Sequence, residues 1–151
     1  MIRVEWVGSE PEWLAVLALR IEVFVDEQKC PADEEPDAYD AHARHLMAVD
    51  NGVVVGCARV IDKGDRHAKV GRVAVRRDRR GTGIGALVMR AALDALTGEG
   101  CRMVSLEAQV PVIAFYERLG FVADGPVYLD AGIPHRHMER SLEDWIIDRS
   151  D

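Results

Sequence analysis

Stretches in which apolar and polar residues alternate recur along this chain, and they predict seven strands. These stretches cover residues 2–7, 44–50, 52–62, 68–76, 102–109, 121–130 and 136–142. Apolar residues at helical spacing predict a helix that begins after Ser9 and runs to about residue 25. The same spacing predicts helices over 84–100 and 110–120, and glycines mark the C-terminal end of each helix. Residues 26–43 are polar, contain two prolines and are expected to form a loop.

The order β-α-β-β-β-α-β-α-β-β predicts an α/β fold, with a mixed, mostly antiparallel sheet flanked by helices. Two β-α-β crossovers within residues 70–123 predict parallel neighbouring strands there. The turn signal at residues 50–52, Asp-Asn-Gly, predicts a hairpin. With 151 residues and neither repeats nor a low-complexity linker, the chain is expected to form a single domain over 1–151.

Charge is distributed unevenly along the chain. The net charge is −7, made up of −8 in residues 1–50, +5 in residues 51–100 and −4 in the remainder. The negative total argues against nucleic-acid binding, while the basic centre suggests an anionic ligand and the acidic part a cationic one. No apolar run is long enough to predict a membrane helix or a secretory signal. Three widely spaced cysteines are expected to be reduced thiols in a cytoplasmic protein.

The stretch Arg-Arg-Asp-Arg-Arg-Gly-Thr-Gly-Ile-Gly, residues 76–85, lies between a predicted strand and a predicted helix. Such a junction exposes backbone N–H groups at the positive end of the helix dipole, and glycines allow a bulky anion to approach them. The stretch lacks the Gly-Lys-Ser/Thr ending of a nucleotide-binding P-loop. Its Gly-x-Gly-x-Gly spacing also differs from the dinucleotide fingerprint. The pattern therefore suits a phosphate or pyrophosphate held at Arg80-x-x-Gly83-x-Gly85.

This loop resembles the pyrophosphate loop of the GNAT superfamily of acyl-CoA N-acyltransferases. A second landmark, Ala-Gln-Val-Pro-Val-Ile-Ala-Phe-Tyr-Glu-Arg-Leu-Gly-Phe at 108–121, resembles the helix of that superfamily that ends in Tyr-x-x-x-Gly-Phe. The phrases Arg-Ile-Glu-Val-Phe-Val-Asp-Glu-Gln at 20–28 and Gly-Ile-Pro-His-Arg-His-Met at 132–138 are similar to the ElaA-like branch. The resemblance runs from about residue 19 to residue 138.

The resemblance implies how a CoA thioester is held. The backbone of residues 73–75 would pair with the pantetheine arm, and the N–H of Val73 would stabilise the oxyanion. Arg80, with Arg79 as a further candidate, would contact the pyrophosphate together with the backbone of residues 81–85. Gln109 stands where the superfamily often has asparagine, and its amide would bond the pantetheine or cap the following helix. The complete set of expected cofactor-binding residues is Val73, Ala74, Val75, Arg80, Gly81, Thr82, Gly83, Ile84, Gly85, Gln109 and Phe115.

Catalysis requires a proton donor for the thiolate and an acceptor for the amine proton. Tyr116 stands at the tyrosine position of the family, and a phenol with a pKa of about 10 can protonate a thiolate. Glu107 shares a strand face with Ser105 and Gln109 and is the first candidate base, acting directly or through water. His45 and Glu27 are the alternatives.

The acceptor is expected to be a primary amine, free or on a protein. Seven acidic residues within 26–40 would attract it, and the expected acceptor-binding residues are Glu27, Asp40, His45 and His135. His135 and His137 alternate with Glu139, but no Cys/His cluster accompanies them, so no metal is expected.

Two functions remain open on this basis. The first is an acetyl-CoA-dependent N-acetyltransferase that transfers the acetyl group directly. The second is a non-catalytic acyl-CoA-binding sensor, which would need neither Tyr116 nor an ionisable cleft. A homodimer through the apolar cluster Trp145, Ile146 and Ile147 is a further expectation, although this cluster could instead cover the sheet of its own chain.

Overall fold

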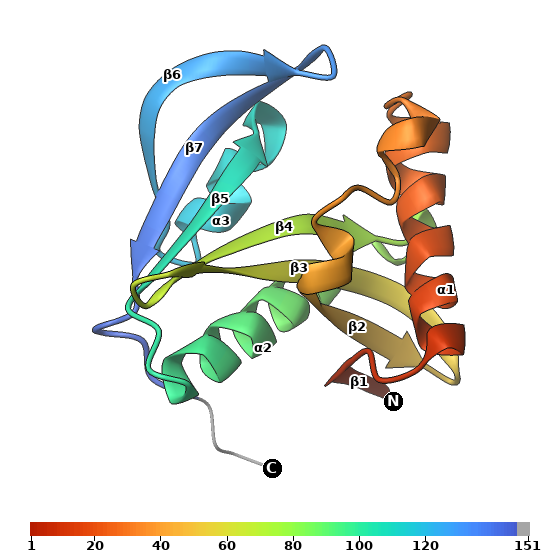
Figure 1. Ribbon diagram of the computed structural model, residues 1–151, viewed down its shortest axis with the longest axis horizontal. Helices are drawn as coiled ribbons and strands as arrows, with labels where there is room; N and C mark the ends of the chain where they lie inside the picture. The colour runs from red at the N-terminus through yellow and green to blue at the C-terminus, as the bar shows by residue number, and fades with distance from the viewer. Residues whose placement is uncertain (148–151) are drawn as a thin grey trace. The chain divides into compact units, whose positions relative to one another are not determined.

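The computed structural model describes residues 1–147, and its seven strands form one sheet in the order β1-β2-β3-β4-β5-β7-β6 (Figure 1). The predicted order of elements and the mixed, mostly antiparallel sheet with flanking helices are confirmed. The strands are β1 (Ile2–Trp6), β2 (Arg44–Asp50), β3 (Val53–Gly64), β4 (His67–Val75), β5 (Met103–Gln109), β6 (Val122–Asp130) and β7 (Ile133–Ser141). The α-helices are α1 (Glu10–Arg20), α2 (Ile84–Gly98) and α3 (Ile113–Glu117).

One of the two predicted parallel pairings is correct. Strands β4 and β5 are parallel, with residues 67–69 opposite residues 103–105. The second prediction is wrong because β7 occupies the place beside β5 and runs antiparallel to both β5 and β6. The chain can turn back after β6 because Ala131 and Gly132 both adopt positive φ angles, 52° and 76°, as tight hairpins require.

The first helix begins as the sequence indicates and ends differently. The Ser9 hydroxyl accepts a hydrogen bond from the N–H of Glu12 (3.3 Å), and the Glu12 carboxylate accepts one from the N–H of Gly8 (2.8 Å). After α1 the chain continues as a π-helical segment, Ile21–Glu27, in which the N–H of Gln28 donates to the carbonyl oxygen of Val23. Helical backbone therefore reaches Glu27, two residues beyond the predicted end.

The chain forms two compact units, and the expectation of a single domain stays a prediction. The first unit contains Met1–Ile61 and Arg72–Ala92. In its core, α1 and the π-helical segment pack on one face of β2, β3 and β4. The residues of this cluster are Val16, Leu19, Val23, Met47, Val49, Cys57 and Ala74.

The opposite face of the same strands receives the start of α2 (Figure 1). Gly56 of β3 lies under Ile84, and a Cβ at position 56 would come within 2.8 Å of that side chain. Glycine is therefore needed at this position for close packing rather than for a turn. The packing fixes the first turn of α2, and with it the loop that precedes the helix.

The second unit contains Asp62–Gly71 and Leu93–Asp151, described as far as residue 147. Alternation along β5 and β7 buries one face, where Val104, Leu106, Ala108 and Met138 are almost fully inaccessible. The segment after α3 turns at Gly120, whose φ is +90°. A Cβ there would also meet the Arg140 guanidinium at 2.7 Å.

The C-terminal cluster is only partly exposed. The indole N–H of Trp145 donates to Asp94 of α2 (2.8 Å), and the Arg140 guanidinium lies over the indole ring. Ile146 remains 87% exposed. Residues 148–151 of the segment lie outside the described part of the chain, and dimer formation stays a prediction. None of the helices that the structure describes is long and apolar enough to cross a bilayer.

Candidate active site

The predicted site residues divide between the two units. The cofactor loop, residues 73–75 of the strand before it, and Glu27, Asp40 and His45 belong to the first unit, whereas Glu107, Gln109, Phe115, Tyr116 and His135 belong to the second.

The predicted anion-binding loop joins β4 to α2 in the first unit. Gly81 and Gly83 have φ angles of 78° and 88°, and an added Cβ at either position would contact nothing within 4 Å. Glycine is therefore required here for its backbone conformation and not for lack of space. The hydroxyl of Thr82 donates to the carbonyl oxygen of Arg79 (2.5 Å), which closes the loop on itself. Because the Ile84 side chain is buried, only its backbone can meet a ligand.

Arg79 and Arg80, the two arginines expected to contact the pyrophosphate, are both paired with carboxylates. Arg80 makes a two-pronged contact with Glu27 (2.8 and 2.9 Å), and its Nε donates to the carbonyl oxygen of Val75 (3.1 Å). Arg79 donates to Asp50 (2.6 Å). Glu27, which the sequence assigned to the acceptor, is thus bound to the cofactor loop, and its acceptor role stays a prediction.

The strand assigned to pantetheine follows an unusual backbone conformation. Arg72 of β4 has a φ of 49°, a left-handed conformation that costs an L-residue about 1–2 kcal/mol. Beyond it, Ala74 is buried in the core, and the N–H of Arg76 donates to the carbonyl oxygen of Val55 (2.8 Å). Ala74 therefore packs through its side chain, and the pairing of residues 73–75 with the pantetheine arm stays a prediction.

A buried ionic network occupies the first unit, and the sequence analysis did not find it. Arg20 is 1% exposed and binds Glu35 (2.6 Å) and Asp40 (2.9 Å). The same acids and Asp37 also bind two further arginines, so that three cations balance three anions. These contacts are Arg59–Asp37 (2.6 Å), Arg59–Asp40 (3.2 Å), Arg72–Glu35 (2.5 Å) and Arg72–Asp37 (3.0 Å).

Asp40 is the central anion of this network. Burial by itself would raise the pKa of its carboxyl, but hydrogen bonds and charge attraction from Arg20 lower that pKa to about 2. Both carboxylate oxygens accept bonds from Arg20, and one also accepts the N–H of Asp37. Its predicted role in acceptor binding is untested and stays a prediction. Long-range pairing of this kind leaves no local signal, because the partners are 15 (Arg20–Glu35) to 37 (Arg72–Glu35) residues apart.

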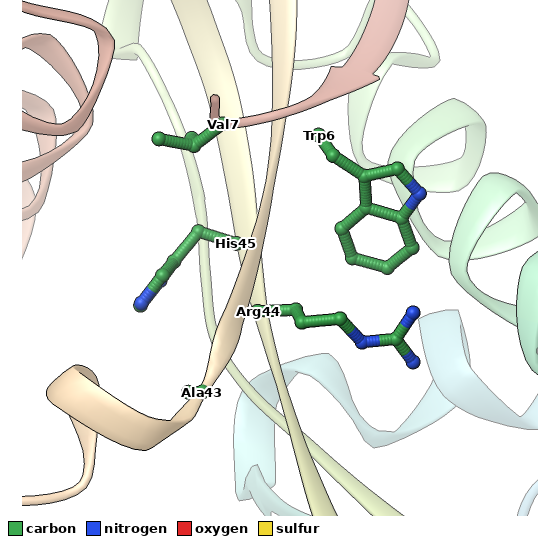
Figure 2. Close-up of a pocket in the computed structure, with 5 residues that line it drawn as sticks. All are labelled: Trp6, Val7, Ala43, Arg44 and His45. Atoms are coloured by element: carbon green, nitrogen blue, oxygen red, sulfur yellow. The ribbon is translucent and has the colours of Figure 1, made fainter. Parts of the chain in front are cut away.

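His45 belongs to the same interior. Its Nε2 lies 3.1 Å from the carbonyl oxygen of Asp40, and its ring contacts Trp13 at 4.6 Å between centroids. Burial lowers the pKa of the imidazole, which favours the neutral ring. The ring also lines a hollow of about 240 Å³. Arg44 lines it too, and Figure 2 shows that the side chains of His45 and Arg44 point to opposite sides of β2. This volume is below the roughly 300–1,000 Å³ of drug-sized ligand sites.

One face of β5 in the second unit carries Glu107, the predicted base. Ser105, Glu107 and Gln109 lie opposite Glu139, His137 and His135 of β7, which confirms that each set shares one face. Glu107 accepts hydrogen bonds from the Tyr128 hydroxyl (2.6 Å) and from Nδ1 of His137 (2.7 Å). Burial would raise the pKa of Glu107, but these two bonds outweigh it and lower that pKa. The carboxylate is therefore an anion at neutral pH.

His137 lies between two carboxylates. Its Nε2 is 3.1 Å from Glu139, while its Nδ1 faces Glu107. Because a carboxylate only accepts, both ring nitrogens must donate, and the ring must be protonated to satisfy both partners. The hydrogen bond to Glu139 raises the pKa of His137. Burial opposes this shift, and the hydrogen bond and negative charge of Glu107 add to it. The alternation of His135, His137 and Glu139 in the sequence indicated no catalytic role for this histidine.

The remaining polar residues on this face have well-defined partners. His135 contacts the carbonyl oxygen of Ile133 through Nδ1 (2.7 Å) and stacks on Tyr128. Nε2 of His67 lies 2.8 Å from the Ser105 hydroxyl. Among residues 1–147, no group of three His, Cys, Asp or Glu side chains is arranged to hold a metal ion.

Tyr116 lies on the buried side of α3. Its ring meets Phe115 and Phe121 edge-to-face, at 4.9 and 6.0 Å between centroids. Burial raises the pKa of the phenol to about 12, so it stays protonated throughout the neutral range. Its predicted role as proton donor to the thiolate stays a prediction.

Comparison with known proteins agrees with this geometry. Residues 13–121 match the model of the acetyltransferase (GNAT) family. The N-acetyltransferase YjcF of Bacillus subtilis is 36% identical over 121 residues, which cover 80% of this chain and 86% of that protein. Escherichia coli ElaA has 32% identity and a TM-score of 0.84, with 93% of this chain and 99% of that chain covered. An acyl-CoA N-acyltransferase from Pseudomonas aeruginosa has 35% identity and a TM-score of 0.81, with 93% and 99% covered.

The family model, which covers most of the chain, and relatives with more than 30% identity agree with each other. The chain belongs to the GNAT family of acyl-CoA-dependent N-acyltransferases and resembles ElaA within it.

Proposed function

We propose that this enzyme transfers the acetyl group of acetyl-CoA directly to a primary amine. The observation that carries the proposal is the loop before α2, where Gly81 and Gly83 adopt left-handed conformations ahead of a helix N-terminus. Such a loop presents backbone N–H groups to a diphosphate. Arg80, which already makes a two-pronged contact with a carboxylate, would offer its guanidinium to the phosphate oxygens in the same manner.

The chemistry assigns one task to each remaining group. The amine loses a proton to Glu107, directly or through a water, and then attacks the thioester carbonyl carbon. The N–H of Val73 stabilises the oxyanion that forms. As the C–S bond breaks, the phenol of Tyr116 gives its proton to the CoA thiolate, and the amide product leaves. The proton taken by Glu107 passes to solvent. The attacking nitrogen loses a second proton as the tetrahedral intermediate collapses to the amide, and that proton restores the phenol.

The imidazolium of His137 tunes this step. A cation 2.7 Å from Glu107 stabilises its carboxylate and so weakens it as a base. Loss of the His137 proton strengthens Glu107, and the amine is then deprotonated more readily. The Glu107–His137–Glu139 group carries one net negative charge, which favours a cationic acceptor.

The combined substitution Arg80→Ala with Gly83→Ala is expected to weaken acetyl-CoA binding at least tenfold. The first change removes a charge-assisted contact, and the second forces an L-residue into a left-handed conformation at a cost of about 1–2 kcal/mol. Calorimetric titration with acetyl-CoA, CoA and NADH measures the effect. Wild type should bind both CoA species and not NADH.

Arg3→Ala with Gly64→Ala is the matched control for this experiment. Gly64 has a φ of +79° and open surroundings like Gly83, and Arg3 is an exposed arginine paired with Glu5. This control should bind acetyl-CoA like wild type. If wild type binds neither CoA species at millimolar concentration, the proposed function is wrong.

Tyr116→Phe is expected to slow thiol release about 100-fold in a screen of amines with acetyl-CoA. The ring and its packing against Phe115 and Phe121 are kept, and only the donor hydroxyl is lost. Thiol release is followed with a disulfide reagent, and acetyl-CoA affinity is measured alongside. Phe115→Tyr added to Tyr116→Phe supplies a hydroxyl on the neighbouring ring instead. This double variant should be as slow as Tyr116→Phe alone. An unchanged rate in Tyr116→Phe would exclude the phenol as the proton donor.

A further inference from the structure

The backbone of Arg72 is held in a conformation that its own chemistry disfavours. Its φ is 49°, in the region that L-residues seldom enter, although it lies within strand β4. Such a conformation persists where the surroundings determine it from several sides. The contacts of Arg72 show which groups do so.

The side chain of Arg72 is fixed by two carboxylates. Its Nε lies 2.5 Å from Glu35, and its Nη2 donates to Asp37 at 3.0 Å. Glu35 is also bound to the buried Arg20, and Asp37 to Arg59. The acids therefore cannot follow Arg72 if it moves, because each is tied to a second cation.

The peptide group between Arg72 and Val73 is held as well. The Cys57 thiol donates to the carbonyl oxygen of Arg72 at 3.5 Å. In a trans peptide the C=O and the following N–H point in opposite directions. The N–H of Val73 therefore points away from Cys57, and the φ of Arg72 together with this bond sets its direction. Two residues further on, the carbonyl oxygen of Val75 accepts a bond from Arg80.

We infer that Arg72 is a positioning residue for acyl transfer. Its ion pairs with Glu35 and Asp37 hold the left-handed backbone that aims the Val73 N–H at the thioester oxygen. This rests on the proposed function, in which that N–H stabilises the oxyanion. Arg72 itself need not touch the substrate, because it acts through the next peptide group.

Arg72→Ala and Arg72→Gly separate this role from a general loss of the network. Both variants lose the same two ion pairs, but only glycine adopts a φ near 49° without penalty. The probe is acetyl-CoA labelled with ¹³C at the thioester carbonyl, whose resonance moves downfield when its oxygen accepts a hydrogen bond. We expect a downfield shift on binding to wild type, most of it retained in Arg72→Gly and lost in Arg72→Ala.

Acetyl-CoA affinity, measured by calorimetry, should stay within about threefold of wild type in both variants, because the loop that binds the pyrophosphate is untouched. Equal shifts in the alanine and glycine variants would overturn the inference. So would a wild-type complex in which the carbonyl resonance does not move. Failure of wild type to bind acetyl-CoA would instead defeat the proposed function, and the inference with it.

Asp37→Asn provides the test if Arg72→Ala does not fold. This variant removes one of the two carboxylates and leaves the Arg72–Glu35 pair in place. A reduced carbonyl shift at unchanged affinity is expected. The exposed Arg3→Ala variant, which breaks a surface ion pair, should show the full shift. An Asp37→Asn protein with the full wild-type shift would overturn the inference.

Discussion

Arg20→Met is expected to lower the free energy of unfolding by about 3–5 kcal/mol, the usual cost of leaving a buried ion pair with one partner. Arg20 is 1% exposed, and the Glu35 and Asp40 side chains that it binds are 3% and 5% exposed. Methionine keeps much of the volume, so that the loss comes from charge. The melting temperature should fall by roughly 6–20 °C.

The double variant Arg20→Met with Asp40→Asn is the control for this interpretation. It removes one cation and one anion, so the charges of Glu35, Asp37, Arg59 and Arg72 balance. The double variant should be more stable than Arg20→Met alone. Arg3→Ala, at an exposed pair, should change stability by no more than about 0.5 kcal/mol. A double variant that is less stable than the single one would contradict an electrostatic origin.

The difference in unfolding free energy between wild type and Arg20→Met depends on pH because Asp40 titrates. Arg20 holds the pKa of its carboxyl at about 2, below the usual 3.8. A lowered pKa contributes stability that is complete above the unfolded value and is lost as pH falls through the folded value. The difference between wild type and Arg20→Met should therefore shrink as pH falls from about 4 to about 2. Chemical denaturation at a series of pH values measures this change.

Glu107→Gln is expected to reduce kcat/KM at neutral pH by roughly 10²–10⁴-fold, with an amine acceptor identified in the acetyl-CoA screen. Glutamine keeps the shape and can still accept a bond from Tyr128, but it cannot take the amine proton. Glu5→Gln, an exposed carboxylate in the first unit, should leave the rate unchanged. A Glu107→Gln enzyme within a few-fold of wild type would show that the amine loses its proton elsewhere.

The pH profile tests the role of His137 beside this base. The bond to Glu139 raises the pKa of the imidazole above its usual 6.5, and kcat/KM should rise with pH as that proton is lost. Glu139→Gln removes the largest cause of the shift, so the rise should move to lower pH. An unchanged profile in Glu139→Gln would exclude His137 as the titrating group.

Local patterns in the sequence determined the strands, the starts of α1 and α2, and the position of the glycine loop between β4 and α2. Alternation along each strand also placed Glu107 with Ser105 and Gln109 on one face of β5, and His135 with His137 on one face of β7, because side chains in strands alternate with a period of two. The Ser9 cap and the Asp-Asn-Gly turn are similarly local, since each depends on a few consecutive residues. The family resemblance added the roles that no periodicity can show.

Only the tertiary structure decided which charges meet. The acids of residues 26–40 appear in the sequence as a surface that attracts amines, yet Glu35, Asp37 and Asp40 neutralise arginines from α1, β3 and β4. It also placed β7 beside β5 and Glu27 against Arg80. Long-range pairs of this kind depend on how the strands and helices pack, and the spacing of residues along the chain carries no record of that packing.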